Sequence, residues 1–358
     1  TGTSDRQEAE RYLARKMESI REATVYGKRP RRKFREAATR YLNDFAWKRS
    51  IDRDARALKA LDPFIGDMWL DCVHNESFKA YIDARHRCPA PGCKRIAAGT
   101  INRDLAVARR ILNLSARLWR GEGSTLTWLA EAPLIQLLEN KKARKPYPID
   151  WSEQELLFSE LTPHLRQAAL FKVNTGMREK EVCQLRWEWE QRVPELDTPE
   201  IKRTVFVLPE WLTKNKEARA VVLNDVAQRL VDGLRDQHPT YVFTWEDREG
   251  RRRRFHRLNN SGWKAARRRA AGRYLKELGR PAPEGFRRVR VHDLKHTCGR
   301  RLRAAGVGFE DRQDILAHKS GRMTTHYSAA ELGNLVAAVN RIGNSHGIHT
   351  GTVLRLVA

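Results

Sequence analysis

Two segments in the second half of the chain place cationic side chains where they can act on a phosphate group. In residues 174–187, Gly176 lies between two helical patterns and permits a sharp turn. Arg178 follows that turn, and Glu181 lies three positions later on the same helical face. An arginine at such a turn can direct its planar guanidinium at a phosphate. Lys214 lies in a charged turn between two β-like segments, where an ammonium group can donate a proton to a leaving oxygen.

Two segments nearer the C-terminus add imidazoles, an amine and a phenol. His292 and Lys295 share one face of an expected helix because they are three residues apart. His318 then precedes Tyr327 by nine residues. A phenol has an ordinary pKa of about 10, so Tyr327 needs nearby positive charge or a base before it can act as a nucleophile. Each segment alone is weak evidence, because charged turns and Arg–Glu pairs are common on protein surfaces.

The elements that must position these residues fall into two regions. Residues 34–138 show helical periodicity throughout, with no stretch that alternates as a strand should. Beyond residue 150, helical patterns flank two β-like segments, 204–208 and 219–223, which are typical of a hairpin. The sequence therefore predicts a mainly α protein, with an all-α domain followed by an α+β domain that contains a small antiparallel sheet.

Capping residues and periodicity set the expected helix limits. Thr100 is a candidate N-cap with Asp104 in the first turn, and Ser152 is another, with Glu155 at the capping-box position. Pro63 is expected to break one helix. The expected helices span residues 1–26, 34–45, 51–65, 78–87, 100–119, 128–138, 165–175, 225–236, 260–279, 292–306, 309–317 and 332–339.

The charge balance indicates a polyanionic partner. The 358 residues include 69 Lys and Arg against 44 Asp and Glu, a formal net charge of +25. Nucleic acid is the first candidate, and an anionic membrane surface is the weaker one. We find no apolar run of about 18 residues and no signal-peptide pattern, which disfavours membrane-spanning and secreted classes. Five cysteines, an odd number, also disfavour a disulfide framework, so we expect a cytoplasmic protein.

Taken together and in this order, the four segments resemble the tyrosine recombinases, specifically the phage-type integrases. The active site of that family has an Arg in a TGxR turn, a hairpin Lys, an HxxR pair, a second His or Trp, and a C-terminal Tyr. The matching residues here are Arg178, Lys214, His292, His318 in a segment similar to LGHxS, and Tyr327 in a segment similar to MTxxY. Glu181 matches the acidic residue that usually follows the first Arg, and Lys216 is the alternative to Lys214.

One position departs from the family pattern, which has Arg where this chain has Lys295. Lysine keeps the positive charge but lacks the two-pronged donor fork of arginine. The loss of one preorganised donor to a developing oxyanion typically costs a factor of about 10²–10³ in rate. We therefore expect a member that works differently, works slowly, or carries a change that stalls cleavage.

The resemblance implies a site-specific DNA recombinase. The matched cations and imidazoles would neutralise the nonbridging phosphate oxygens. Tyr327 would attack with His292 as base, forming a 3′-phosphotyrosine and freeing a 5′-hydroxyl that Lys214 protonates. Because the covalent link conserves bond energy, we expect no nucleotide cofactor and no metal.

The resemblance also implies the partners. We expect double-stranded DNA with a specific recombination site, and a homotetramer that passes through a Holliday junction. Integration, excision and inversion would all use the same active site. A need for accessory DNA-bending proteins is left open, and the expected location is the cytoplasm of a bacterium, at its nucleoid.

The same resemblance predicts the domain organisation. It assigns a coupling helix to residues 1–27, an all-α, SAM-like core-binding domain to 28–140, a linker to 141–149, a catalytic domain to 150–328 and a tail to 329–358. The tail has two interpretations, docking on a neighbouring subunit and a frayed terminus. The chain opens without Met, so an arm-binding domain ahead of it stays an open question.

Basic segments supply the expected contacts with the DNA backbone, because lysine and arginine neutralise phosphates. Two of these segments contain proline and flank the helical domain, and a third is a helix start similar to the family's TxNR. The expected DNA-binding residues are Lys28, Arg29, Arg31, Arg32, Lys33, Arg103, Lys141, Lys142, Arg144 and Lys145.

Three other interpretations compete with these. Zinc could bind Cys88 and Cys93 with Cys72, His74 or His86, although a second Cys pair is missing, and we favour a loop with free thiols. A non-cleaving DNA-binding or architectural protein of the same fold is kept open by the lysine in the HxxR pair. A type IB topoisomerase would share the chemistry but not the integrase-like N-terminal region.

Overall fold

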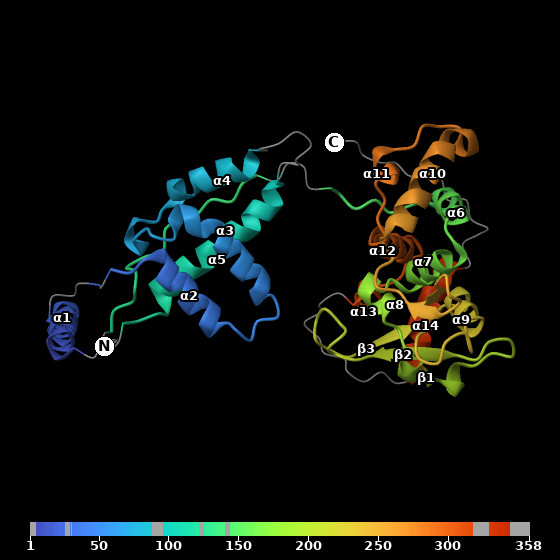
Figure 1. Ribbon diagram of the computed structural model, residues 1–358. Coiled ribbons are helices and arrows are strands. Elements are labelled where there is room, and N and C mark those ends of the chain that lie inside the picture. The colour runs from blue at the N-terminus through green and yellow to red at the C-terminus, as the bar shows by residue number, and fades with distance from the viewer. Residues whose placement is uncertain are drawn as a thin grey trace. The chain divides into compact units, whose positions relative to one another are not determined.

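The computed structural model describes residues 5–25, 29, 31–87, 96–121, 125–139, 144–317 and 329–343. Its contacts divide the chain into two compact units, unit 1 (Thr1–Ala143) and unit 2 (Arg144–Ala358). Helices dominate both units in Figure 1, and the paired strands of the described residues are all antiparallel. The expectation of a mainly α protein with a small antiparallel sheet is confirmed. Among the described residues, no helix is both long and apolar enough to cross a membrane.

Aromatic side chains fill the core of unit 1. Phe34, Tyr41, Phe78 and Tyr81 are almost completely buried between its helices. The Tyr41 hydroxyl donates to the buried carboxylate of Asp54 at 2.9 Å, so the polar end of this ring is satisfied. The helices of unit 1 are α1 (Arg6–Val25), α2 (Phe34–Asp44), α3 (Ile51–Ile65), α4 (Lys79–His86) and α5 (Ala98–Arg117), with 3₁₀ turns at Leu70–Cys72 and Asn75–Phe78.

Residues 128–138 do not form the helix that their periodicity predicted. The segment is irregular, and Pro133 gives one reason, because proline lacks an N–H and clashes with the preceding helical turn. The side chain of Asn102 on α5 supplies hydrogen bonds instead. Its Oδ1 accepts from the N–H of Leu138, and its Nδ2 donates to the carbonyl of Leu138, both at 2.8 Å. The apolar spacing reflects residues such as Ile135 that are buried without being helical.

One expected break and one expected helix start in unit 1 also differ from the structure. α3 continues unbroken through Pro63 to its end at Ile65. α5 begins at Ala98, so Thr100 lies inside the helix and does not cap it. The Thr100 prediction was therefore wrong.

Helix α6 (Trp151–Ser159) is capped by a different residue from the one predicted. Asp150 is the N-cap, and its carboxylate accepts from the N–H of Glu153 at 2.8 Å. Glu153 completes the capping box by accepting from the N–H of Asp150 at 3.0 Å. The proposed pair, Ser152 and Glu155, lies two residues too far along the chain.

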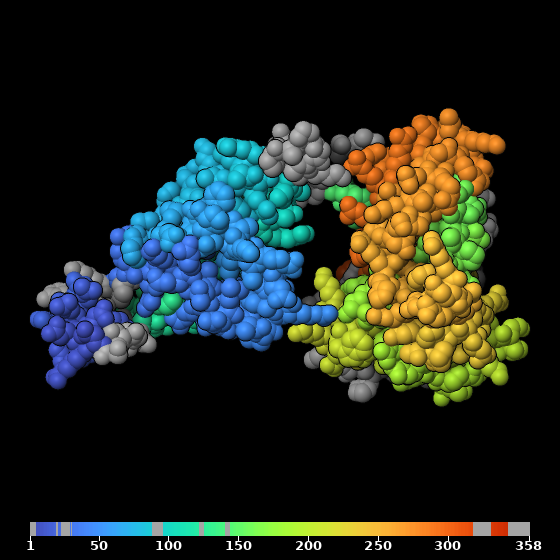
Figure 2. All heavy atoms as spheres, viewed as in Figure 1, coloured from blue at the N-terminus to red at the C-terminus, as the bar shows by residue number. Residues whose placement is uncertain are grey.

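Unit 2 places helices around and above a small sheet. In Figure 1, α10 and α11 lie with α6 at one end of the unit, the three-stranded sheet lies at the other, and α7, α8 and α12 lie between them. Figure 2 shows the chain from β4 to α10, in yellow to orange, covering one face of the unit. The remaining helices are α7 (Pro163–Thr175), α8 (Glu179–Cys183), α9 (Asp225–Asp232), α10 (Ser261–Leu278), α11 (Glu284–Arg287), α12 (Asp293–Ala304), α13 (Phe309–Leu316) and α14 (Ala329–Gly343).

The predicted hairpin is the centre of the sheet. Strands β2 (Thr204–Leu208) and β3 (Arg219–Val222) pair with Leu208 opposite Arg219, so the residues between them form the connecting turn. β1 (Glu190–Arg192) adds to the other edge of β2. Neither β1 nor the separate pair β4 (Thr244–Glu246) and β5 (Arg252–Arg254) was predicted from the sequence. Strands of three residues are too short to show an alternating pattern.

Helix α14 packs inside unit 2. It covers the predicted helix at residues 332–339 and extends it in both directions. Its buried side chains, including Leu335 and Val339, join a core shared with α12, α13 and the sheet. Asn340 Oδ1 accepts from the N–H of Asp225 at 2.8 Å, which fixes α14 to the start of α9. Residues 329–343 are therefore neither frayed nor free of their own unit.

Candidate active site

A cavity of about 570 Å³ in unit 2 brings the predicted catalytic residues together. Arg178 immediately precedes α8, Lys214 lies in the β2–β3 turn, and His292 and Lys295 lie at the start of α12. These four are all of the predicted catalytic residues within the described ranges. Segments that are far apart in the sequence therefore line the same cavity.

Gly176 makes the turn that presents Arg178. It ends α7 in the left-handed region at φ +63°, which favours glycine. A Cβ at this position would lie 2.6 Å from Cδ2 of Leu316, so any larger residue would also collide with α13. The Arg178 N–H donates to Oε2 of Glu181 at 2.7 Å, and its Nη1 donates to Oε1 at 2.9 Å. The backbone and side chain of Arg178 are thereby held by one carboxylate.

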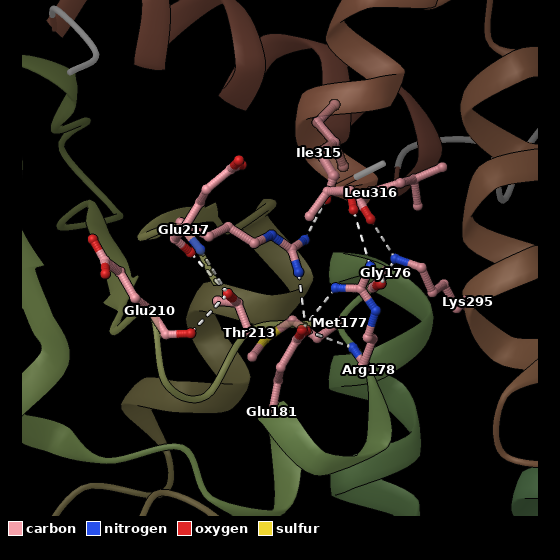
Figure 3. A network of polar contacts seen from close by, with 12 residues as sticks. Gly176, Met177, Arg178, Glu181, Glu210, Thr213, Glu217, Lys295, Ile315 and Leu316 are labelled. Carbon is pink, nitrogen blue, oxygen red and sulfur yellow. Dashed lines mark hydrogen bonds and ion pairs between the residues drawn. The ribbon is translucent and has the colours of Figure 1, made fainter. Parts of the chain in front are cut away.

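Glu181 is a buried carboxylate that two arginines share (Figure 3). Its side chain is 1% exposed, and Arg219 Nη1 on β3 donates to its Oε2 at 3.0 Å. Burial alone would raise the pKa of Glu181, but the charge of Arg219 and the hydrogen bonds from Arg178 bring it below its ordinary value. The carboxylate is therefore ionised and fixes the direction of the Arg178 guanidinium.

The C-terminal end of α13 accepts hydrogen bonds from the side chains of two arginines and one lysine (Figure 3). The three bonds are Arg219 Nη2 to the carbonyl of Ile315 at 2.5 Å, Lys295 Nζ to that of Leu316 at 2.5 Å, and Arg178 Nη2 to that of Ala317 at 3.0 Å. Carbonyls at a helix C-terminus lack intrahelical donors and carry partial negative charge, which favours cations there. The site residues are thus tied to the helix that directly precedes His318.

Two buried lysines hold the turn before Arg178. Lys295 is 5% exposed and donates to the carbonyl of Gly176 at 2.7 Å, while Lys172 on α7 is fully buried and donates to the carbonyl of Met177. Burial lowers the pKa of Lys295 to about 6, helped by nearby arginines, and burial lowers that of Lys172 to about 8. Burial therefore favours the neutral form of the Lys295 amine, whereas an arginine at this position would stay charged.

Two imidazoles line the cavity from α12. The rings of His292 and His296 meet edge to face with centroids 5.0 Å apart. Burial is the main reason that the pKa of each lies below its ordinary value, and the charge of Lys172 lowers both further. A neutral imidazole can accept a proton, as a general base must. His296 was not among the catalytic residues that the sequence predicted.

Lys214 reaches the cavity from an exposed turn closed by a neighbouring hydroxyl. Thr213 Oγ1 donates to the carbonyl of Glu217 at 2.8 Å and accepts from its N–H at 3.2 Å. Lys216, the alternative hairpin lysine, has φ +59° and is not among the residues that line the cavity. The structure therefore favours Lys214.

Comparison with known proteins agrees with this geometry. Residues 152–332 match the model of the phage integrase family. This chain belongs to the phage integrase family. It is a tyrosine site-specific recombinase. It is 24% identical over 375 residues to the integrase of Salmonella phage P22, a match that covers 97% of this chain and 89% of that protein.

Solved integrase structures share the fold. The Tn1549 transposon integrase in complex with circular-intermediate DNA superposes with a TM-score of 0.52 at 14% identity, over 81% of this chain and 92% of that one. A lambda integrase dimer bound to a COC′ core site superposes with a TM-score of 0.53 at 13% identity, over 91% of this chain and 100% of that one. These likenesses show the fold of this integrase.

The predicted nucleophile and second histidine of this integrase, Tyr327 and His318, lie outside the described residues. The structure describes the chain up to Ala317 and again from Ala329. Their roles remain those that the family resemblance assigns.

In unit 1 of the integrase, two predicted DNA-binding residues are already paired. Arg31 forms a two-pronged ion pair with Asp71 at 3.1 and 3.2 Å, and its guanidinium lies 4.8 Å from the ring centroid of Trp69. Lys33 Nζ lies 3.1 Å from a carboxylate oxygen of Asp67. These contacts favour a structural role for this part of the basic segment.

The other predicted contacts of unit 1 differ among themselves. Arg32 stacks on Trp128, with its guanidinium 4.3 Å from the ring centroid, and Arg29 Nε donates to the carbonyl of Thr127 at 3.1 Å. Arg103 is exposed on α5. Lys28, Lys141 and Lys142 lie outside the described residues. Phosphate contacts by these residues stay predictions.

Arg144, predicted to meet DNA from the linker, is instead bound to the helix that carries the site. Its guanidinium makes a two-pronged ion pair with the buried carboxylate of Asp293, at 2.5 and 3.1 Å. The same carboxylate accepts from the N–H of Arg290 at 2.7 Å and so helps to form the start of α12. Lys145, the next residue, is exposed. Arg144 therefore has a clear structural role at the entry to unit 2.

The cysteines give no support to a metal site within the described residues, where no cluster of three or more His, Cys, Asp or Glu side chains could hold a metal ion. Cys72 is exposed, and Cys88 and Cys93 lie outside those residues. Burial raises the pKa of Cys298 to about 11 and that of Cys183 to about 12, so both thiols are unreactive.

The sequence analysis missed two buried cations of this site. Arg219 begins β3, and Lys172 lies within an apolar helical run. A charged residue inside an otherwise buried pattern was the available signal, because such a residue must find a partner. The sequence could not name the partners, which lie on distant segments.

Proposed function

We propose that this integrase cleaves and rejoins DNA at a specific site through a 3′-phosphotyrosine intermediate. The observation that carries the proposal is the cavity in which Arg178, Lys214 and His292 meet. These supply a fixed donor for a phosphate oxygen, an exposed ammonium and a neutral imidazole. Charge stabilisation and two proton transfers are what a phenol needs to displace an alcohol from a phosphodiester.

Arg178 is the donor to the nonbridging oxygens. A guanidinium has five N–H groups, and the contacts with Glu181 and Ala317 use one on each terminal nitrogen. The remaining N–H groups can donate hydrogen bonds to the phosphate oxygens. Because Glu181 already fixes the guanidinium, little orientation remains to be lost when DNA binds.

The proton transfers balance in the proposed reaction. His292 takes the proton of the Tyr327 phenol, and the phenolate oxygen forms a bond to phosphorus. The bond from phosphorus to the 5′-oxygen breaks, and Lys214 gives that oxygen a proton. Rejoining reverses these steps with the 5′-hydroxyl of a second strand as the attacking group.

Lys295 enters the proposal as an amine that gains a proton when a phosphate arrives. A neutral amine has two protons, which match the carbonyls of Gly176 and Leu316. A nearby negative charge raises the pKa of an amine, and the third proton then faces the phosphate. The lysine is therefore compatible with cleavage, and we do not expect a stalled enzyme.

The finer parts of the proposal are the substrate and the assembly. We propose a duplex with a recombination site, bound by unit 1 as the core-binding domain and by unit 2 as the catalytic domain. Four copies would complete two strand exchanges through a Holliday junction. Support comes from the shared fold of a Tn1549 integrase solved with circular-intermediate DNA and of a lambda integrase dimer on a core site. Accessory bending proteins and a nucleoid location stay predictions.

Covalent capture tests the cleavage step. The purified protein is incubated with a pool of nicked duplexes of randomised sequence, and DNA that stays attached in detergent is sequenced. We expect an adduct on a recurring sequence, absent from the Tyr327→Phe variant. No adduct with either the wild type or a Lys295→Arg variant would overturn the proposal, and relaxation of supercoils without sequence preference would indicate a topoisomerase.

A further inference from the structure

Two groups of arginines in unit 2 are paired with carboxylates of the same unit. Arg251 and Arg253 both pair with Asp247, at 3.2 and 2.5 Å. Arg269 and Arg273, on α10, both pair with Glu160, at 2.6 and 2.5 Å. The paired carboxylates lower the local positive potential that would attract a DNA phosphate. Arginine density alone therefore does not locate a phosphate site here.

Three other arginines line the cavity that holds Arg178. They are Arg300 and Arg303 on α12 and Arg312 on α13. Within the described part of the chain, none of the three forms an ion pair, and no Asp or Glu is among the residues lining the cavity. A cavity with cations and no described carboxylate has a positive potential that attracts anions.

The packing of α12 against α13 fixes the relative positions of these arginines. Core residues of both helices, including Cys298 and Ile315, are buried together. A Cβ at Gly299 would lie only 3.0 Å from Leu316 Cδ1, so the two helices approach closely beside Arg300. On the exposed rim, the Arg312 guanidinium lies 5.7 Å from the ring centroid of Phe309, which is 66% exposed. Stacking of this kind restricts the rotamers of an exposed arginine.

The row of basic residues that α12 contributes to the cavity is longer than the contact with a single phosphate needs. From His292 to Arg303 the chain advances along α12 by roughly 16 Å, at about 1.5 Å per residue. One strand of B-DNA presents a phosphate about every 3.4 Å along its axis. A backbone whose cleaved phosphate lies at Arg178 and His292 therefore has further phosphates within reach of the other arginines.

We propose that Arg300, Arg303 and Arg312 form a second phosphate subsite, which binds the DNA backbone beside the phosphate that is cleaved. This inference rests on the proposed function, because it takes the strand in the cavity to be the substrate. The subsite sets the position of the strand along α12, so that one phosphate is in register with Arg178. Contacts of this kind give affinity and register without sequence information.

Salt dependence of binding tests the subsite. The cleavage-blocked Tyr327→Phe protein is titrated with a labelled duplex a few helical turns long, with and without Arg300→Gln, Arg303→Gln and Arg312→Gln. Each lost phosphate contact lowers the slope of log affinity against log salt by about 0.9, so the triple variant should lose about 2.7. The matched control carries Arg253→Gln, Arg269→Gln and Arg273→Gln and removes the same charge. We expect its slope to stay that of the parent, and equal changes in both variants would overturn the subsite.

Neutral phosphates then locate the contact. Methylphosphonate groups are placed one at a time along the duplex, and each weakens binding where a contact is lost. In the parent protein, we expect methylphosphonates next to the cleaved phosphate to weaken binding. In the triple variant these methylphosphonates should have no effect, and a protein with Arg→Lys at the same three residues should show the effect again. If no adduct forms with active protein but the slope change is present, cleavage is disproved and the subsite stands. If the adduct forms and the slope does not change, only the subsite is disproved.

Discussion

Lys295 Nζ lies 2.7 Å from the carbonyl oxygen of Gly176, and this hydrogen bond joins the helix that carries His292 to the turn that presents Arg178. The same amine donates to the carbonyl of Leu316 at the end of α13. Three segments of the site therefore meet at one nitrogen atom. In the protein without DNA, Lys295 positions other groups and contributes little fixed charge of its own.

Replacement of Lys295 should separate cleavage from binding. Lys295→Met removes both hydrogen bonds and the proposed third donor, so we expect adduct formation in a single turnover to fall by at least about 10²-fold. DNA affinity should change by only a few-fold, because the buried amine is mostly neutral before DNA arrives. Lys295→Arg, which restores the family's residue, should keep cleavage. A methionine variant that cleaves at the wild-type rate would disprove this role.

The two buried lysines should make stability rise with pH. In the unfolded chain both bind a proton up to a pKa of 10.5, whereas in the folded protein Lys295 loses it above about pH 6 and Lys172 above about pH 8. Between these limits the unfolded state binds more protons, so the free energy of unfolding increases with pH, by up to about 1.4 kcal/mol per unit for each lysine. Urea unfolding from pH 7 to 9 should therefore show a shallower rise for Lys295→Met. The exposed control Lys202→Met should follow the wild type, and equal slopes in all three proteins would contradict a buried neutral amine.

Loss of charge at Glu181 should destabilise unit 2. Glu181→Gln keeps the shape of the side chain but leaves the buried Arg219 without its carboxylate partner. Breaking a buried ion pair by removing one member typically costs about 3–5 kcal/mol. The exposed pair of Arg273 with Glu277 supplies the control, since Glu277→Gln should cost less than about 1 kcal/mol. Denaturant midpoints measure both variants, and similar shifts would count against a structural role for the shared carboxylate.

Two glycines share a left-handed backbone conformation, so alanine at each position distinguishes the cost of backbone strain from the cost of a steric collision. Gly176 has φ +63° and Gly279 has φ +65°, but only the first has atoms within 4 Å of an added Cβ. Gly279→Ala should cost about 1–2 kcal/mol from the left-handed conformation alone. Gly176→Ala should cost more and should also slow cleavage, because it displaces Leu316 and with it the end of α13. Thermal unfolding and adduct formation provide the two measurements, and identical effects of both substitutions would refute the collision.

A sulfur leaving group tests Lys214 as the general acid. A thiolate leaves without prior protonation far more readily than an alkoxide. Lys214→Ala should therefore cleave an ordinary nicked duplex slowly but recover on a duplex with sulfur at the bridging 5′ position. Lys216→Ala should behave as the wild type on both substrates. Recovery by the second variant instead of the first would reverse the assignment.

The sequence indicated the groups proposed to react more directly than the groups that hold them. Arg178, Lys214 and His292 could be found because each lies in a short local pattern that the family resemblance connects. Arg219 and Lys172 could not be assigned a role, because their hydrogen-bond partners become neighbours only after folding. The neutral state of Lys295 also depends on burial that no local pattern reports.

The fold was predicted where periodicity and backbone preference agreed. The β2–β3 hairpin and the longer helices of unit 2 satisfy this condition. Residues 128–138 do not, because Pro133 opposes the helix that the apolar spacing suggests, and a side-chain amide on Asn102 satisfies the backbone instead. The strand β5 could not be predicted from the sequence for another reason. Its consecutive arginines are typical of a solvated surface, and only the pairing with β4 shows that they form a strand.

The end of α13 supplies the site with hydrogen-bond acceptors before any DNA is present. Its carbonyls are the acceptors for Arg178 and Lys295, so these side chains have already exchanged much of their water for protein oxygen during folding. A phosphate oxygen that arrives with the DNA then either replaces one of these carbonyl oxygens as a hydrogen-bond acceptor or binds in addition to it. The dehydration of these side chains is thus largely a cost of folding, and the free energy of DNA binding remains available for bringing the strand into register.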